Sequence, residues 1–158
     1  MDNVNTQTFV TSSESQTRAL GARIARSLKA GDVVLIEGDL GAGKTVITQG
    51  ICAGLGISEN IPVRSPTFTL IHEYPHDPPV RHADLYRLDD GAEAENIGLF
   101  DDTASRITII EWAEKLPPEM KHGAITIKIE PLSENERKIM LSAPAAALDI
   151  INTANGTT

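Results

Sequence analysis

The alternation of apolar and polar positions predicts strands and helices that follow one another along the chain. Residues 32–37 contain the unbroken apolar run VVLI, which is typical of a central strand buried on both faces. Apolar residues recur at helical spacing over residues 46–55, just after the loop that follows this strand. An earlier helix is expected to begin at a capping sequence, residues 11–14 or 13–16, and to end near residue 29.

The remaining apolar segments are short, and most of them are predicted to be strands. Two of these strands are separated only by the turn HDPP and should form a hairpin. We expect residues 89–100 to form a loop with a short helix. Residues 1–145 should form one domain, followed by a flexible tail over residues 146–158. The predicted strands other than the central one are residues 6–10, 67–74, 80–86, 107–110, 124–130 and 137–141.

Composition narrows the class of protein and of partner. A chain of 158 residues is long enough to bury one sizeable core. Its formal net charge of −8 argues against a protein that grips a nucleic acid alone, because such affinity rests mainly on Lys and Arg. No apolar run approaches the ~18 residues of a membrane helix, and the first ten residues do not resemble a secretory signal. Cys52 is the only cysteine, which excludes an internal disulfide and favours a cytoplasmic location.

The strongest motif is GDLGAGKT, residues 38–45, which fits the phosphate-binding pattern G-x-x-x-x-G-K-[ST]. Its glycines let backbone N–H groups approach phosphate oxygens, and the following helix directs its N-terminal dipole at the anion. Lys44 is placed to reach the β- and γ-phosphates, and the Thr45 hydroxyl to bind Mg²⁺. The alternative, a chance glycine-rich turn, is disfavoured by the flanking strand and helix.

This order of strand, loop and helix predicts a three-layer α/β domain of P-loop NTPase type. Its central sheet should be largely parallel with added antiparallel strands, and helices should cover both faces. ATP and Mg²⁺ are the expected cofactors.

Two acids stand where a metal ligand or a water-orienting group is needed. Glu111 follows the apolar run ITII, which is the usual Walker B position at the end of a core strand. Asp84 lies near the end of another predicted strand. Either acid is alternatively a solvated strand terminus, and the pattern does not decide which one binds metal and which orients water. Thr67, after Ser65-Pro66, is a candidate switch residue that senses the γ-phosphate, or else part of a plain proline-fixed turn.

One motif points to different chemistry. The segment HEYPH, residues 72–76, matches the zinc-protease pattern H-E-x-x-H, in which both histidines lie on one helical face. Pro75 stands between the two histidines, and a proline inside a helix costs about 3 kcal/mol. The preceding residues also have strand character. We therefore expect no zinc site.

Four motifs in order resemble the TsaE (YjeE) family, small bacterial P-loop ATPases of tRNA threonylcarbamoyladenosine modification. They are GDLGAGKT, SPTFTL at residues 65–70, HADLYR at residues 82–87 and IEW at residues 110–112. The resemblance spans about residues 11–141. It implies an ATPase that is slow alone and acts with TsaB and TsaD, and whose ATP cycle permits turnover of that complex. Contact with tRNA would be indirect, through the complex, and no membrane is involved.

The resemblance also assigns roles to residues. It implies that Thr45, Asp84 and Glu111 serve the metal and hydrolysis, together with Lys44 and Thr67 as catalytic residues. Family members often carry a second Thr after the P-loop Thr; here that position is Val46, which still offers its backbone N–H. The residues expected to bind the nucleotide are Ser13, Glu14, Gly38, Asp39, Leu40, Gly41, Ala42, Gly43, Lys44, Thr45, Val46 and Arg137.

Two other functions fit a phosphate loop. A small-molecule kinase would use the same loop, but such kinases usually have an arginine-rich lid, and no such insertion separates these motifs. A GTPase-like regulator would need an N/T-K-x-D sequence to read guanine, which the chain lacks.

Overall fold

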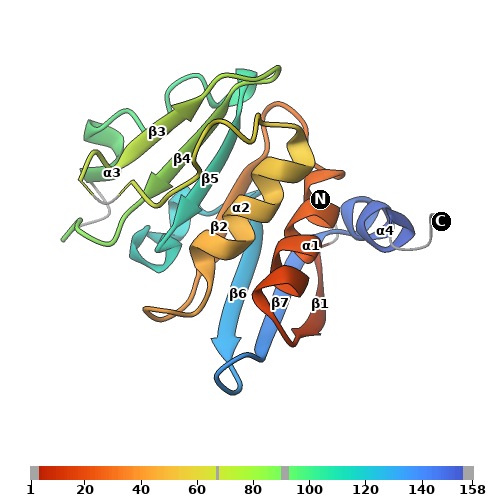
Figure 1. Cartoon of the computed structure of the whole chain (residues 1–158). Coiled ribbons are helices and arrows are strands. Elements are labelled where there is room, and N and C mark those ends of the chain that lie inside the picture. Colours follow the sequence, from red (N-terminus) through yellow and green to blue (C-terminus); the bar gives the residue numbers. More distant parts are fainter. Residues whose placement is uncertain (1–3, 67, 90–92, 155–158) are drawn as a thin grey trace.

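The computed structural model describes residues 4–66, 68–89 and 93–154 (Figure 1). In this part of the chain, seven strands form one sheet in the order β1-β7-β6-β2-β5-β4-β3. The strands are β1 Val4–Thr11, β2 Val33–Glu37, β3 Ile71–Tyr74, β4 Val80–Asp84, β5 Ile107–Glu111, β6 Ile125–Pro131 and β7 Arg137–Pro144.

The middle of the sheet is parallel, and antiparallel strands extend it at both sides. Strand β2 pairs in parallel with β5 and β6, and β4 pairs in parallel with β5. Strands β3, β7 and β1 join antiparallel, and β3 and β4 form the predicted hairpin. The apolar run of β2 lies at the centre, where both faces of a parallel sheet are covered. The predicted fold class is confirmed.

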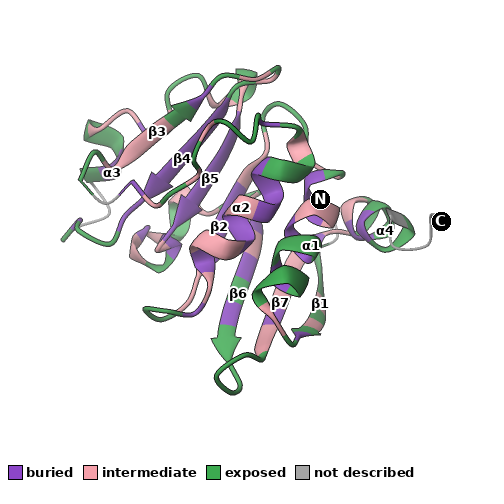
Figure 2. Ribbon diagram, viewed as in Figure 1, coloured by how far each residue is buried: buried purple, intermediate pink, exposed green. Residues whose placement is uncertain are grey.

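Helices cover the two faces unequally (Figures 1 and 2). One core cluster joins alternate residues of the sheet to three helices, α1 Glu14–Ala25, α2 Lys44–Leu55 and α4 Ala145–Ala154. A second cluster on the opposite face holds Leu35 and Ile110. There the cover comes from loops and four short helical turns, α3 Glu93–Asn96 and the 3₁₀ turns η1 Thr103–Ser105, η2 Ala113–Lys115 and η3 Pro118–Met120.

Glycines bring α1 and α2 into close backbone contact. A Cβ atom on Gly21 would lie 2.5 Å from the Ile47 carbonyl oxygen, and one on Gly50 would overlap the Arg18 carbonyl. A Cβ on Gly54 would lie 2.7 Å from the Ala22 Cα. The spacing of Gly50 and Gly54 suggests close approach of this helix to the sheet, but the surface they contact is α1.

The end of the chain differs from its prediction. A flexible tail was expected over residues 146–158, but residues 145–154 form α4, and residues 155–158 lie outside the described part. Leu148 and Ile151 are buried in the core cluster, and Asn152 exchanges two side-chain hydrogen bonds with Gln7 of β1. Two apolar residues at i, i+3 spacing therefore hold this segment against the core as a helix, although the residues after them are polar.

Three other elements are shorter than predicted. Helix α1 ends at Ala25, not near residue 29, because Arg26 begins a turn. Strand β3 starts at Ile71, since Leu70 has a left-handed backbone with φ 67°. Strand β4 ends at Asp84, two residues before the predicted limit.

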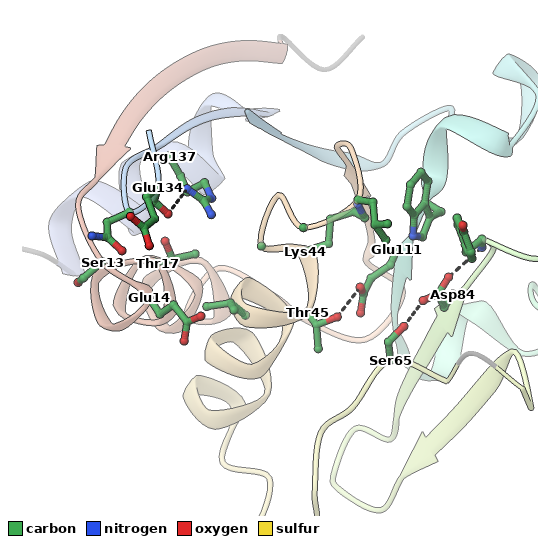
Figure 3. A pocket seen from close by; sticks show the side chains of 17 residues that line it. Ser13, Glu14, Thr17, Lys44, Thr45, Ser65, Asp84, Glu111, Glu134 and Arg137 are labelled. Atoms are coloured by element: carbon green, nitrogen blue, oxygen red, sulfur yellow. Dashed lines mark hydrogen bonds between the residues drawn. The ribbon is translucent and has the colours of Figure 1, made fainter. Parts of the chain in front are cut away.

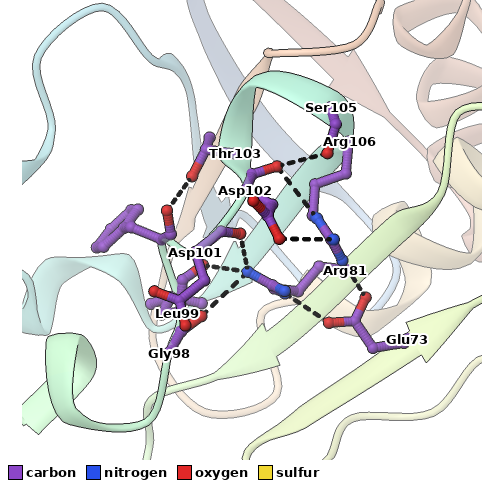
Figure 4. Close-up of polar contacts among 10 residues, drawn as sticks. Glu73, Arg81, Gly98, Leu99, Asp101, Asp102, Thr103, Ser105 and Arg106 are labelled. Carbon is purple, nitrogen blue, oxygen red and sulfur yellow. Dashed lines mark hydrogen bonds and ion pairs between the residues drawn. The ribbon is translucent and has the colours of Figure 1, made fainter.

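A buried arginine fastens the loop after α3 to the hairpin (Figure 4). The Arg81 Nη1 donates to the carbonyl oxygens of Gly98, Leu99 and Asp101, at 2.7–3.0 Å. Its Nε donates to Glu73, whose other carboxylate oxygen accepts from Arg106. Three loop carbonyls thus converge on one guanidinium nitrogen, while the Nε of the same group holds Glu73.

Candidate nucleotide-binding site

A cavity of about 550 Å³ opens at the carboxyl ends of β4 and β5 (Figure 3). Ligands of open α/β sheets usually bind at this edge. Figure 3 shows Lys44 and Thr45 between two groups of side chains, one from the α1 and β7 side and one from the ends of β4 and β5. The cavity is lined by Ser13, Glu14, Thr17, Leu40, Gly41, Gly43, Lys44, Thr45, Val46, Ser65, Asp84, Tyr86, Glu111, Trp112, Glu134, Asn135 and Arg137.

The phosphate loop has the backbone that its glycines permit. Gly41 and Gly43 have φ 79° and φ 110°, in the left-handed region that favours glycine. Helix α2 begins at Lys44 immediately after this turn. A Cβ on Gly38 would lie 2.7 Å from the Ile129 carbonyl oxygen, so the start of the loop passes close to β6. The free N–H groups of a helix start are therefore presented at the cavity, an arrangement suited to phosphate.

Lys44 is held inside the loop. Its side chain is almost buried, with 5% exposed, and its Nζ donates to the carbonyl oxygens of Gly38 at 2.5 Å and Asp39 at 2.8 Å. The same Nζ lies 3.9 Å from the centre of the Trp112 ring, a cation–π distance. Burial lowers the pKa of Lys44, although the nearby carboxylates of Glu114 and Glu111 act in the opposite direction. A desolvated ammonium at this place is a strong electrostatic partner for an anion.

Thr45 and Glu111 are joined directly. The Thr45 hydroxyl donates to Oε1 of Glu111 at 2.8 Å, and Glu111 is the last residue of β5 with 2% exposed. The other carboxylate oxygen, Oε2, lies 2.5 Å from Nε2 of His82. The acid is therefore part of the interior, and the alternative of a solvated strand terminus does not apply to it.

Asp84 stands beside Glu111 in the register of β4 and β5. It is also buried; its Oδ1 accepts from the backbone N–H of Tyr86 at 2.8 Å, and its Oδ2 accepts from the Ser65 hydroxyl. Ser65 opens the SPTFTL segment, so this contact joins the predicted switch segment to an acid of the site. Thr67, the predicted switch residue itself, lies outside the described residues.

The oxygen atoms of this edge are of the kind that Mg²⁺ prefers. Thr45, Glu111 and Asp84 offer a hydroxyl and two carboxylates, the hard donors that Mg²⁺ prefers. Among the described residues, no group of three or more His, Cys, Asp or Glu side chains could hold a metal ion. A magnesium ion here would therefore complete its coordination with phosphate and water oxygens, as is usual for this ion.

The opposite wall comes from α1 and the turn between β6 and β7. Ser13 caps α1 by accepting from the Gln16 N–H at 3.1 Å, so the second of the two possible capping sequences is the one formed. Glu14 lines the cavity and pairs with Arg18 at 3.3 Å. Arg137 donates to the Ala42 carbonyl oxygen at 2.9 Å, which ties the start of β7 to the phosphate loop.

Most of the predicted nucleotide-binding residues line the cavity. Nine of them line the cavity, whereas Gly38, Asp39 and Ala42 shape the loop behind it. Sequence reasoning missed Thr17, Ser65, Tyr86, Glu134 and Asn135 as lining residues. Ser65 and Tyr86 carried a sequence signal, because they stand in the SPTFTL and HADLYR motifs. Trp112, the last residue of the IEW motif, also lines the cavity, and its backbone is left-handed with φ 59°.

The H-E-x-x-H segment has no helical face. His72 lies on strand β3, whereas His76 lies in the following turn. There, Nδ1 of His76 is 3.2 Å from the carbonyl oxygen of Pro78. The strand that Pro75 ends therefore replaces the helix that a zinc protease requires.

Comparison with known proteins decides the family. The sequence model described as "Threonylcarbamoyl adenosine biosynthesis protein TsaE" matches residues 11–139. The chain belongs to the TsaE family. The resemblance noted from the four motifs is thus confirmed. The residues that match the TsaE model include all those that line the cavity.

Individual TsaE relatives agree with this result. The chain is 38% identical over 130 residues to the tRNA threonylcarbamoyladenosine biosynthesis protein TsaE of Bacillus subtilis, covering 81% of this chain and 80% of that one. The Nostoc protein of the same name is 44% identical over 117 residues, or 71% and 70% of the two chains. The crystal structure of Bacillus subtilis YdiB matches with TM-score 0.75 and 29% identity, covering 99% of this chain and 100% of that one. In the described part, no helix is both long and apolar enough to span a membrane.

Proposed function

We propose that this chain binds ATP with Mg²⁺ in the cavity and hydrolyses it, as an accessory protein of threonylcarbamoyl modification of adenosine in tRNA. The observation that carries the proposal is the Thr45–Glu111 hydrogen bond, beside a buried Lys44 in the phosphate loop. It brings a P-loop hydroxyl and a Walker B acid together beside the N-terminus of α2. Membership of the TsaE family supplies the pathway.

Each residue of the site has a role in this proposal. The backbone N–H groups after Gly41 and Gly43 bind phosphate oxygens, and Lys44 exchanges its loop carbonyls for the β- and γ-phosphates. Thr45 and Glu111 hold the metal side of the nucleotide. Bound Mg²⁺ neutralises charge that develops on the transferred phosphoryl group.

Asp84 serves the attacking water in this scheme. It accepts hydrogen bonds from Ser65 and from the Tyr86 N–H, so a change in the SPTFTL segment reaches its carboxylate directly. Such a segment is suited to sense the γ-phosphate and to relax after hydrolysis. Thr67 remains the candidate for that contact.

The partners and the location are part of the same proposal. The chain acts with TsaB and TsaD in the cytoplasm and contacts tRNA only through that complex. Its net charge of −8 favours indirect contact, because a polyphosphate backbone would be repelled. A small-molecule kinase is the second candidate; one feature that favours it is that the cavity lining extends from the phosphate loop to Glu134 and Asn135.

Phosphate release from ATP tests the proposal. The rate is measured with the chain alone and with TsaB plus TsaD, and ³¹P NMR follows every phosphorylated product. We expect slow release of inorganic phosphate by the chain alone and nucleotide-dependent assembly with the partners. The variants Glu111→Gln and Asp84→Asn keep the shape of each acid and should lose hydrolysis. A stoichiometric phosphorylated small molecule would replace this proposal by the kinase.

A further inference from the structure

A buried chain of hydrogen bonds leads from the hairpin to the candidate metal side of the site. The Tyr74 hydroxyl lies 3.0 Å from Nδ1 of His82, and Nε2 of His82 lies 2.5 Å from Oε2 of Glu111. The other oxygen of Glu111 accepts from Thr45 at 2.8 Å. Tyr74 and His82 are outside the cavity lining, so neither side chain reaches the nucleotide space.

The register of β4 and β5 brings the residues of this hydrogen-bond chain together. His82 is paired with Ile109 in the parallel ladder of β4 and β5, and Glu111 lies two residues further along β5. Residues two apart on a strand share a face. The imidazole therefore reaches diagonally to the carboxylate, on the face where Tyr74 also belongs to the core cluster.

The hydrogen bonds that join Tyr74, His82 and Glu111 are enclosed in the protein interior. His82 has 0% exposed and Tyr74 4%, so water does not compete for these hydrogen bonds. Burial raises the pKa of the Tyr74 hydroxyl, with Cys52 adding to this and the backbone of Arg64 opposing it. Because a carboxylate can only accept, Nε2 of His82 carries the ring proton and donates it in the hydrogen bond to Glu111, and Nδ1 of the neutral ring then accepts from the Tyr74 hydroxyl.

We propose that His82, oriented by Tyr74, is a positioning residue that fixes the Glu111 carboxylate for the metal side of the site. With Oε2 held by the imidazole, Oε1 is left facing Thr45. The rotamer of a glutamate at a strand end is thereby set before any ligand arrives. This inference rests on the proposed role of Glu111, and a partner one step behind a ligand commonly tunes metal affinity in this way.

The first test uses the nucleotide-free protein. The four histidines are labelled with ¹⁵N, and His82 is assigned by comparison with His82→Gln. We expect a slowly exchanging proton on Nε2 of His82 and a shift of its Nδ1 signal in Tyr74→Phe. An exposed histidine, His122, should show neither feature. A His82 ring without a proton on Nε2 would overturn the inference, because it could not donate to Glu111.

The second test separates metal from nucleotide. Affinity for a fluorescent ATP analogue is measured in EDTA and along a Mg²⁺ titration, for wild type and for His82→Leu, His82→Gln and Tyr74→Phe. We expect His82→Leu to leave the affinity in EDTA unchanged and to raise the half-saturating Mg²⁺ concentration about 10–100-fold. His82→Gln, which keeps an N–H donor, should recover part of the loss, and Tyr74→Phe should show a smaller loss.

A control distinguishes positioning from stability. Thr108→Val changes another buried polar side chain of β5 and should leave the Mg²⁺ dependence as in wild type. An unaltered Mg²⁺ dependence in folded His82→Leu, or equal weakening in EDTA and Mg²⁺, would overturn the positioning role. If wild type itself binds no nucleotide, the proposed function fails, whereas the NMR result still decides whether the hydrogen-bond chain exists.

Discussion

Substitution of Gly50 by alanine should destabilise the protein, although alanine is the better helix former. In the interior of a helix alanine is favoured over glycine by about 1 kcal/mol. At Gly50, however, the new Cβ would overlap the Arg18 carbonyl oxygen and would lie 2.8 Å from both the carbonyl carbon and the Cα of Arg18. These are backbone atoms, which cannot rotate away, so α1 and α2 must separate.

The expected size follows from overpacked cores. Inserting a methyl group where there is no room typically costs about 1–3 kcal/mol. The overlap with three backbone atoms of Arg18 places Gly50→Ala at the upper end, so about 2 kcal/mol remains after the gain of about 1 kcal/mol in helix propensity. For a chain of this length that lowers Tm by about 4–8 °C. Because α1 carries Ser13, Glu14 and Thr17 into the cavity, nucleotide affinity should fall as well.

Denaturant unfolding and calorimetry of Gly50→Ala provide the assay. Ala53→Gly, at an exposed position of the same helix, is the matched control and should lose only about 1 kcal/mol from helix propensity. A Gly50→Ala variant that is as stable as wild type, or more stable, would refute the close contact between α1 and α2.

Three further predictions concern buried polar groups. Among the described residues, Thr108 Oγ1 is a buried oxygen without a hydrogen-bond partner, so Thr108→Val should raise the free energy of unfolding by about 1 kcal/mol; a loss of stability would show a partner. Arg81→Met should cost about 3 kcal/mol in denaturant unfolding, and Arg81→Lys should not restore it, because a single ammonium nitrogen cannot contact both the loop carbonyls and Glu73. Burial raises the pKa of the Cys52 thiol to about 12, with Glu111 adding to it, so stability should fall as pH rises from about 9 toward about 12, since only the unfolded chain releases this proton there. Rapid alkylation of native Cys52 at pH 8, at the rate of the unfolded chain, would contradict its burial.

The centre of the fold was predictable because its patterns are local. The run VVLI in β2 is entirely apolar and the run ITII in β5 is interrupted only by Thr108, as is typical of strands covered on both faces. Once both were placed in a parallel sheet, their carboxyl ends had to share one edge. The meeting of Glu111 with the phosphate loop follows from that rule.

Other features depend on contacts between distant residues. Helix α4 is short and Ala-rich, and it forms because Leu148 and Ile151 find a core surface beside α1 and β7. A short helix with little support of its own depends on such packing. Its existence therefore could not be derived from residues 145–154 alone.

The supporting residues of the site were hidden for a related reason. His82 stands in the same motif as Asp84, but a search for metal ligands considers the acids first. Its contact with Glu111 depends on the relative register of β4 and β5, which the sequence does not specify. The same holds for Ser65, which meets Asp84 across 19 positions of the chain.

The central claim is that the phosphate loop binds ATP with Mg²⁺, and isothermal titration of wild type and Lys44→Ala tests it most directly. Lys128→Ala, at an exposed position of β6, is the control for loss of one positive charge. Hydrogen bonds to charged groups contribute about 1.5–3 kcal/mol each, and 1.4 kcal/mol is tenfold in affinity, so losing Lys44 should weaken binding about 100-fold or more. We expect one ATP per chain for wild type and Lys128→Ala, and binding weaker by about 100-fold or more for a folded Lys44→Ala. Wild-type affinity in Lys44→Ala would contradict the account.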